Sequence, residues 1–260
     1  HGSLGGLGTV ADFAVAGGRA YLARGSAGLA VIDLTDPAFP ALAGTLALPT
    51  SATAIGLYGA LVVAAGEGSF YLVDPTTPDA MAIVGQTTTV VATDLAVVGS
   101  HALVTSATGI ATIDLATPSA PAQVALFAGS EPANPEFHGL SVDGNHALVS
   151  GQRWVLVQID PHWSEYQLTP WLWTFDVSNP TSLSRVTDKP YRGASAHAIL
   201  LREGHAAVLE HHGWLEVLAP EGLTLEGMLP SSPAISGAAW PNSYLYAGAG
   251  TAGLAVFNLT

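Results

Sequence analysis

One short strand-like segment recurs along this chain at intervals of about forty residues, and this repetition limits the possible folds more than any other feature. The segment reads Gly-Leu-Ala-Val-Ile-Asp at residues 28–33, and later copies end at Asp74, Asp114, Asp176, Leu218 and Asn258. Subtraction of successive end positions gives steps of 41, 40, 62, 42 and 40 residues. Six copies at this spacing indicate a repeat architecture in which each unit buries its apolar faces against its neighbours.

Each repeat contains three further strand-like pieces. Two lie upstream and are joined by a Gly-rich hairpin turn, as in residues 12–16 and 19–23. Prolines then mark the turn into a fourth piece, as in residues 41–48. Four short strands per unit, repeated six times, are typical of a β-propeller. The sequence therefore predicts an all-β fold, a six-bladed β-propeller with four antiparallel strands per blade.

The two ends of the chain predict how the ring closes. The last repeat ends just after its third strand, whereas residues 3–9 resemble the fourth-strand segment that precedes each new blade. We expect residues 3–9 to pair beside the strand ending at Asn258, so that this N-terminal strand closes the ring and leaves no open sheet edge. Within a single domain, the expected blades are residues 10–48, 52–89, 92–128, 137–187, 195–230, and 234–260 with 3–9.

The repeat also resembles a known family. Residues 28–37, Gly-Leu-Ala-Val-Ile-Asp-Leu-Thr-Asp-Pro, with Asp12-Phe-Ala-Val before them, are similar to the LVIVD-repeat family of bacterial β-propellers. The family pattern is kept well in blades one, three and four, loosely in blade two and poorly in blade five, where Leu218 replaces Asp. The resemblance covers nearly the whole chain and implies an exported or cell-surface protein. It implies no reaction, because the motif is structural and propellers have many functions.

Composition and charge exclude several classes of function. The formal charge of −13 repels phosphate backbones, so nucleic acid is not an expected partner. The chain has no Cys, which excludes disulfides, a thiolate nucleophile and a zinc–thiolate site. It has no apolar run long enough to span a membrane. The opening His1-Gly2-Ser3 is typical of an affinity-tag remnant, and we expect an extracytoplasmic protein (periplasmic, cell-surface or secreted) whose signal peptide has been removed.

Chemically versatile residues are concentrated in the second half of the chain, which holds all six Trp, five of the seven basic residues and seven of the nine His. His101, His146 and His205 share one repeat position, just after the first hairpin turn, so we interpret them as part of the scaffold. His138 and His197 share a different position, at the start of the innermost strand of two adjacent blades. That position holds small residues elsewhere, namely Ala11, Thr53, Thr93 and Ser236. A departure of this kind from a repeated pattern is a candidate functional position.

Strand direction predicts which loops lie near these two His. Both should lie at one mouth of the central channel, together with the loops between second and third strands. In blade five this loop contains His211 and His212, and in blade four it is lengthened to residues 151–170. The connections that contain Glu136 and Arg192 should reach the same rim.

This cluster predicts a His-centred catalytic site. Imidazole and carboxylate ligands suit Zn, Cu, Mn or Fe. We expect His138 and His197 to form a metal-binding triangle with one of His211 and His212, because adjacent side chains diverge. Arg153 or Arg192, on or beside the covering loops, would neutralise the carboxylate of an acidic sugar; a lactone is the other substrate class considered. The same His pair could perform acid–base chemistry without a metal. The reaction class is then a hydrolase or a lyase.

The competing interpretation is a non-catalytic binding or scaffold propeller. Trp163, Trp214 and Tyr166, with Glu136 beside them, could form a platform for a small molecule, a glycan or a peptide. Trp171 and Trp173 lie two apart in a repeat strand, which favours packing within the blade. The sequence leaves both the enzyme and the binding module open, together with the substrate and the oligomeric state.

Overall fold

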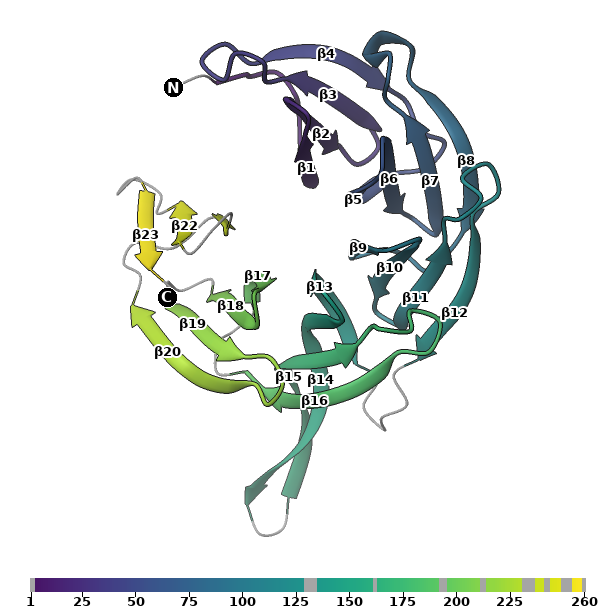
Figure 1. Ribbon diagram of the computed structural model, residues 1–260. Helices are drawn as coiled ribbons and strands as arrows, with labels where there is room; N and C mark the ends of the chain where they lie inside the picture. The colour runs from purple at the N-terminus through teal and green to yellow at the C-terminus, as the bar shows by residue number, and fades with distance from the viewer. Residues whose placement is uncertain are drawn as a thin grey trace. The chain divides into compact units, whose positions relative to one another are not determined.

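The computed structural model describes residues 3–128, 135–160, 163–191, 196–210, 214–230, 237–240, 244–248 and 254–258. These residues form five sheets of four antiparallel strands, one sheet of three strands and a 3₁₀ helix, η1 (Pro78–Ala80) (Figure 1). The all-β class is confirmed. By its internal contacts the chain divides into two compact units, His1–Ala128 and Gly129–Thr260.

The first unit contains three sheets, each formed by four consecutive strands in chain order. Sheet one consists of β1 (Asp12–Ala16), β2 (Arg19–Ala23), β3 (Leu29–Asp33) and β4 (Ala41–Leu46). Sheet two consists of β5 (Ala52–Tyr58), β6 (Leu61–Gly66), β7 (Ser69–Asp74) and β8 (Ala82–Thr88). Sheet three consists of β9 (Asp94–Val98), β10 (His101–Ser106), β11 (Gly109–Asp114) and β12 (Ala122–Ala128).

The core of this unit lies between successive sheets. Leu29 and Val31 of sheet one pack against Ile55 and Val62 of sheet two, and a second apolar layer joins sheets two and three. The middle strands read as continuous apolar runs because neighbours cover both of their faces. At the outer strands the backbones approach closely, since a Cβ on Gly44 would lie 1.8 Å from the carbonyl oxygen of Pro78. Only glycine fits there.

The second unit repeats this arrangement. Sheet four consists of β13 (Glu136–Asp143), β14 (His146–Asp160), β15 (Trp163–Asp176) and β16 (Ser184–Pro190). Sheet five consists of β17 (Ala196–Arg202), β18 (His205–Glu210), β19 (Trp214–Ala219) and β20 (Thr224–Pro230). The sixth sheet contains β21 (Gly237–Ala239), β22 (Tyr244–Gly248) and β23 (Leu254–Asn258).

Two of the tryptophans lie in the core of the second unit, as the sequence predicts. Trp171 and Trp173 are 8% and 2% exposed. The ring of Trp173 meets that of Phe137 edge to face, with centroids 5.0 Å apart. Between sheets four and five, Leu148 and Leu172 pack with residues that include Ile199 and Val208. Both tryptophans are therefore blade-packing residues.

The prediction for residues 3–9 is wrong in the described part of the chain. They form no strand, and five four-stranded sheets are present where six were expected. Gly6 and Gly8 have φ angles of +79° and +70°, which interrupt an extended strand. Instead, Leu4 and Leu7 pack on one face of sheet one, and the Leu7 carbonyl accepts a hydrogen bond of 2.7 Å from Arg24 Nε.

The aspartate that ends the third strand of the first four repeats has a structural role. We call Asp33, Asp74, Asp114 and Asp176 the turn aspartates. Each accepts a hydrogen bond of 2.8–2.9 Å from the backbone N–H two residues later, which fixes the turn into the fourth strand. Hydrogen bonds from these turns lower the pKa of three of them, with the backbone N–H as the largest cause at Asp33 and Asp176 and the Thr76 side chain at Asp74.

The pairing of these strands agrees with a scaffold role for the recurring His position. His101 and His146 begin their strands directly opposite the turn aspartates Asp114 and Asp176, where sheet one pairs Arg19 with Asp33. In sheet five, where Leu218 replaces the aspartate, His205 Nδ1 lies 2.7 Å from Glu226 Oε2. In these four sheets this position therefore holds a basic or titratable side chain near a carboxylate, whereas sheet two has Leu61 there.

Candidate functional site

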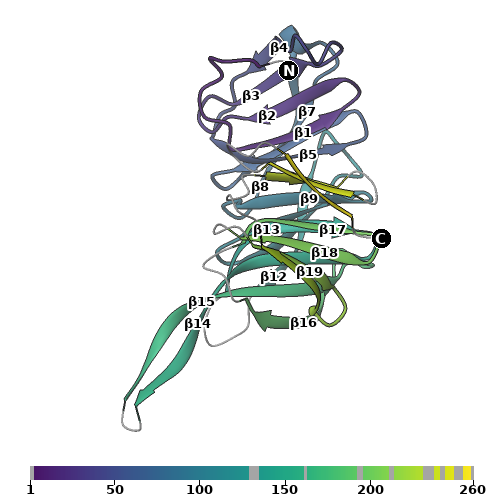
Figure 2. The same ribbon diagram turned by 90° about the vertical axis from the view of Figure 1, so that its left-hand side faces the viewer.

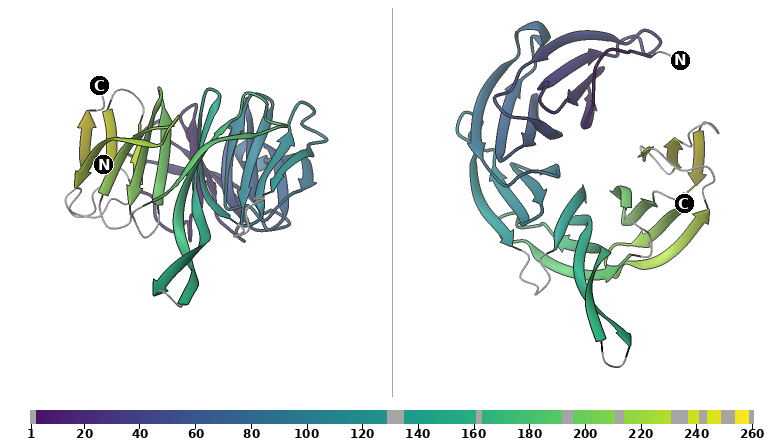
Figure 3. Two further views of the ribbon diagram at one scale, coloured as in Figure 1. Left: turned by 90° about the horizontal axis from the view of Figure 1, so that it is seen from below. Right: turned by 180° about the vertical axis from the view of Figure 1, so that it is seen from behind.

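The segment 151–170, expected to be a covering loop, is a two-stranded extension of sheet four. The antiparallel ladder of β14 and β15 runs without interruption from His146↔Asp176 to Gln158↔Ser164. Strands β13 and β16 accompany it only as far as Gln152 and Trp171. Beyond them the hairpin projects from its own sheet (Figures 1, 2 and 3). The loop prediction is wrong, and we call residues 153–160 and 163–169 the arm.

One side of the arm is apolar and exposed. Successive strand residues alternate between faces, and residues directly opposite each other share a face. The ladder pairs Trp154 with Leu168 and Leu156 with Tyr166. Their exposures are 44% for Trp154, 56% for Leu156, 60% for Tyr166 and 40% for Leu168. We call these four residues the apolar face. Gln158 and Ser164 continue it toward the tip, so it carries no charged residue.

The opposite side of the arm combines polar residues with two valines and is less exposed. It pairs Arg153 with Thr169, Val155 with Gln167 and Val157 with Glu165. Gln167 Nε2 donates a hydrogen bond of 2.9 Å to Glu165 Oε1. Near the tip, Ile159 and Trp163 add two further exposed apolar side chains, at 46% and 55%. The arm therefore has two chemically distinct sides.

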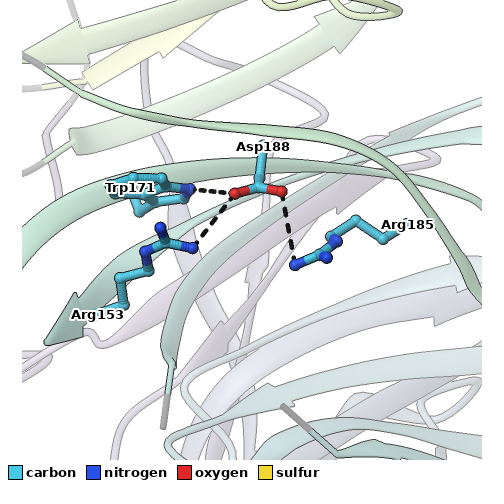
Figure 4. A network of polar contacts seen from close by, with 4 residues as sticks. All are labelled: Arg153, Trp171, Arg185 and Asp188. Atoms are coloured by element: carbon cyan, nitrogen blue, oxygen red, sulfur yellow. Dashed lines mark hydrogen bonds and ion pairs between the residues drawn. The ribbon is translucent and has the colours of Figure 1, made fainter. Parts of the chain in front are cut away.

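A polar network holds the base of the arm (Figure 4). Asp188 Oδ2 accepts a hydrogen bond of 2.8 Å from Trp171 Nε1 and lies 3.4 Å from Arg153 Nη1. Its other oxygen lies 3.5 Å from Arg185 Nη1. The Arg153 guanidinium also lies over the Trp171 ring, 3.5 Å from its centroid. One carboxylate on β16 thus joins the first residue of the arm to a buried tryptophan.

This network determines where the structure places Arg153. The sequence makes Arg153 a candidate catalytic residue, but its guanidinium contacts Asp188 and Trp171 at the base of the arm. Sequence reasoning missed Asp188 and Arg185 as its neighbours. Asp188 cannot be recognised from a local sequence motif, because strand pairing alone brings Arg153 and Trp171 next to it.

His138 and His197 occupy equivalent positions, as their alignment predicts. Each is the extra residue of a bulge in an innermost strand, since pairing skips from Phe137 to Gly139 in β13 and from Ala196 to Ala198 in β17. Thr53 sits at the same bulge of β5. The His138 side chain is 44% exposed, and its Nε2 lies 3.9 Å from Glu136 Oε2. We call this bulge position the histidine column.

The remaining candidate residues fall into two groups. Trp163 and Tyr166 are on the arm and exposed. Arg192, His211 and His212 lie outside the described residues, and so do the side chains of His197 and Trp214. Within the described part, no three His, Asp or Glu side chains come together as metal ligands. The triangle of His138, His197 and His211 or His212 therefore stays a prediction, as does the metal itself.

No helix in the described residues is long and apolar enough to cross a membrane. Sequence comparison with curated proteins finds no match. Comparison with protein families matches residues 7–47, the first sheet with its preceding segment, to the LVIVD repeat.

Three solved structures of distant sequence have similar folds. The computationally designed Ika8 protein has a TM-score of 0.63 at 10% identity, covering 96% of this chain and 83% of its own. BamB from Moraxella catarrhalis has a TM-score of 0.56 at 15% sequence identity, and the match covers 92% of this chain and 79% of BamB. The Pan2 WD40 domain of Neurospora crassa has a TM-score of 0.62 at 12% sequence identity, and the match covers 95% of this chain and 74% of that domain.

At sequence identities this low, a structural match indicates a similar fold but says nothing about function. The fold that these matches indicate agrees with the consecutive antiparallel sheets described above. The segment that matches the LVIVD repeat, residues 7–47, includes strand β3, which ends at Asp33. The chain thus has the fold of a β-propeller, and its residues 7–47 are similar to the LVIVD repeat.

Proposed function

We propose that this protein is a non-catalytic binding propeller that holds a protein partner on the apolar face of its arm. The observation that carries the proposal is the set of four large side chains, Trp154, Leu156, Tyr166 and Leu168, all on one side and all 40% exposed or more. Contiguous exposed apolar surface of this kind marks interaction sites, whereas single exposed apolar residues are ordinary.

The composition of the face favours a polypeptide over a glycan. Sugar sites combine aromatic rings with closely placed polar groups that bind hydroxyls. Here leucines stand beside both aromatic residues, and the polar side chains on this side, Gln158 and Ser164 toward the tip and Gln152 toward the base, lie outside the four. Large aromatic and aliphatic side chains with few charges are typical of the centre of a protein–protein interface.

The base of the arm supports the same role. A docking element must present its residues in a fixed orientation, because ordering a mobile segment costs binding free energy. The carboxylate of Asp188 holds Arg153 and Trp171 where the arm leaves the sheet. Beyond that point, no described strand pairs with either edge of the arm. The apolar face is therefore anchored at one end and accessible along its length.

A photo-crosslinking experiment tests this function. A photoreactive amino acid is placed at Tyr166 and, in a matched control, at the neighbouring Gln167 on the opposite side. In the producing cells, position 166 should give a discrete crosslinked polypeptide and position 167 should not. Equal crosslinking from both positions, or none from position 166, would contradict a face-specific docking surface.

A second function is favoured by the histidine column. His138 and His197 stand at equivalent bulges of neighbouring strands, and His138 lies 3.9 Å from a carboxylate oxygen. As the alternative to a non-catalytic role, this pairing supports a metal-dependent hydrolase or lyase site for Zn, Cu, Mn or Fe, acting on a small acidic sugar or lactone outside the cytoplasm. Elemental analysis of untagged protein, compared with the His138→Ala/His197→Ala double variant, tests it. Equal metal content in both would contradict this function.

A further inference from the structure

We propose that the partner of the apolar face is the same face of a second copy of this chain, so that two arms pack together in a symmetric dimer. This inference rests on the proposed docking role of the arm and names its partner. Four observations carry it: the arrangement of large and small side chains, the geometry of the arm, the absence of charge on the face and the exposed area.

The side chains of the face are self-complementary. Trp154 and Leu156 follow each other on β14, opposite Leu168 and Tyr166 on β15. The two aromatic residues therefore lie on one diagonal of the face and the two leucines on the other. When two such faces meet about a two-fold axis lying between them, every aromatic side chain meets a leucine. A symmetric interface needs this match, because each patch must fit a copy of itself.

The direction of the arm selects one of the two possible axes. An axis parallel to the strands would place both protein bodies at the same end of the paired arms. An axis perpendicular to the strands makes the arms antiparallel, with the bodies at opposite ends. Because the arm projects beyond its own sheet (Figures 1 and 2), we expect the antiparallel arrangement. Trp154 then lies against the second copy's Leu156, and Tyr166 against the second copy's Leu168.

The charge distribution favours a second copy over a basic partner. The chain has a formal charge of −13, so a partner recognised by charge would be basic. The apolar face offers such a partner no carboxylate, since its residues and their extension by Gln158 and Ser164 are all uncharged. Two copies can therefore meet on this face without burying a charge, which would be costly without a counter-ion.

The exposed area fits a weak, transient interface. The four residues of the face have exposures between 40% and 60%. With roughly 150–250 Å² available on each large side chain, these exposures leave on the order of 400 Å² of apolar surface per arm. Two arms would together bury about 800 Å², which is in the range of transient protein–protein contacts. We therefore expect a weak dimer that dissociates reversibly.

Analytical ultracentrifugation of the full, untagged chain across about 1–100 µM tests the proposal, since a reversible interface of this size should dissociate within that range. Wild-type protein should sediment as a dimer at the upper end. Leu156→Asp and Tyr166→Asp should each raise the dimer dissociation constant by about 100-fold or more, because each would bury an unpaired carboxylate. Gln167→Asp adds the same charge to the opposite side of the arm and should remain dimeric.

Circular dichroism checks that each variant is folded, and Leu156→Ser and Tyr166→Ser replace the aspartate variants if those unfold. The serine variants should also weaken the dimer. Wild-type protein that stays monomeric at every concentration overturns the proposal, and so do Leu156→Asp and Tyr166→Asp variants that dimerise like wild type. Monomeric protein that still crosslinks face-specifically to a different polypeptide overturns the dimer and leaves the docking function intact. Monomeric protein whose arm instead binds phosphatidylcholine vesicles overturns both.

Discussion

Replacing Asp188 by alanine is expected to destabilise the protein strongly, although the residue lies in no core cluster. Its carboxylate accepts the indole hydrogen bond of the buried Trp171 and pairs with Arg153 and Arg185. Alanine would leave the Trp171 N–H without its acceptor in a site that is 8% exposed. It would also leave the two guanidinium groups without their shared counter-ion.

The magnitude follows from these three contacts. A hydrogen bond to a charged acceptor contributes about 1.5–3 kcal/mol. The two ion pairs are partly exposed to solvent, with the Arg153 and Arg185 side chains 23% and 37% exposed, so each contributes only about 0.2–1 kcal/mol. We therefore expect Asp188→Ala to lower the free energy of unfolding by about 2–4 kcal/mol. Asp188→Asn keeps an oxygen that can accept from Trp171 and should lose about half as much.

Urea unfolding followed by far-UV circular dichroism measures these differences. With a denaturant slope of about 2–3 kcal/mol/M, Asp188→Ala should move the midpoint down by about 1 M. Glu165→Ala is the matched control, because it removes a carboxylate from the exposed part of the arm and should change stability by less than about 0.5 kcal/mol. If Asp188→Ala unfolds within about 0.5 kcal/mol of wild type, or if Asp188→Asn is as damaging as Asp188→Ala, the network does not stabilise the base of the arm as argued.

Three further outcomes are expected. Turn hydrogen bonds lower the pKa of Asp33, Asp74 and Asp176 in the folded state. The stability that these carboxylates contribute is therefore present above their unfolded-state pKa, about 4, and is lost as pH falls through the lowered folded-state pKa. Urea midpoints that do not decrease between pH 5 and about 2.5 would contradict this expectation. Gly85→Ala should destabilise by more than about 2 kcal/mol in the same assay, since its Cβ would lie 2.0 Å from the Pro118 carbonyl oxygen, whereas Gly5→Ala meets nothing within 4 Å and should be neutral. Finally, the proposed dimer should tighten between about 0.05 and 0.5 M NaCl in sedimentation runs, because salt screens the repulsion between two copies of charge −13; weakening with salt would point to an ionic interface instead.

Sequence reasoning located the repeated strands because their apolar runs and turns are local properties. The third strands that end at Asp33, Asp74, Asp114 and Asp176 lie where the pattern places them. The alignment that equates His138 with His197 also agrees with the strand bulges. Both predictions succeed for the same reason: the regular spacing of the repeats identifies equivalent positions in each blade, and this spacing can be read without knowing which distant residues are in contact.

The arm could not be predicted in the same way. Trp154, Val155, Leu156 and Val157 are apolar without alternation, so the sequence shows no two-residue period to mark a strand with one polar side. The side of each residue becomes clear only from pairing with β15. The fate of residues 3–9 depends on two glycines with left-handed backbone angles, and the position of Arg153 depends on Asp188, thirty-five residues away. Tertiary contacts decide the first and the last of these features, and local backbone geometry decides the second.

Because the arm continues the strand ladder of sheet four, the side on which its apolar face lies depends on whether the number of residues in each strand is changed by an odd or an even number. Side chains change face at every residue, so removing one residue from each strand of the arm, between its base and the apolar face, would turn that face to the opposite side of the hairpin. Removing two from each strand would shorten the arm and restore the original side. Shortened or lengthened relatives that keep the same surface should therefore differ from this chain by an even number of residues in each strand of the arm.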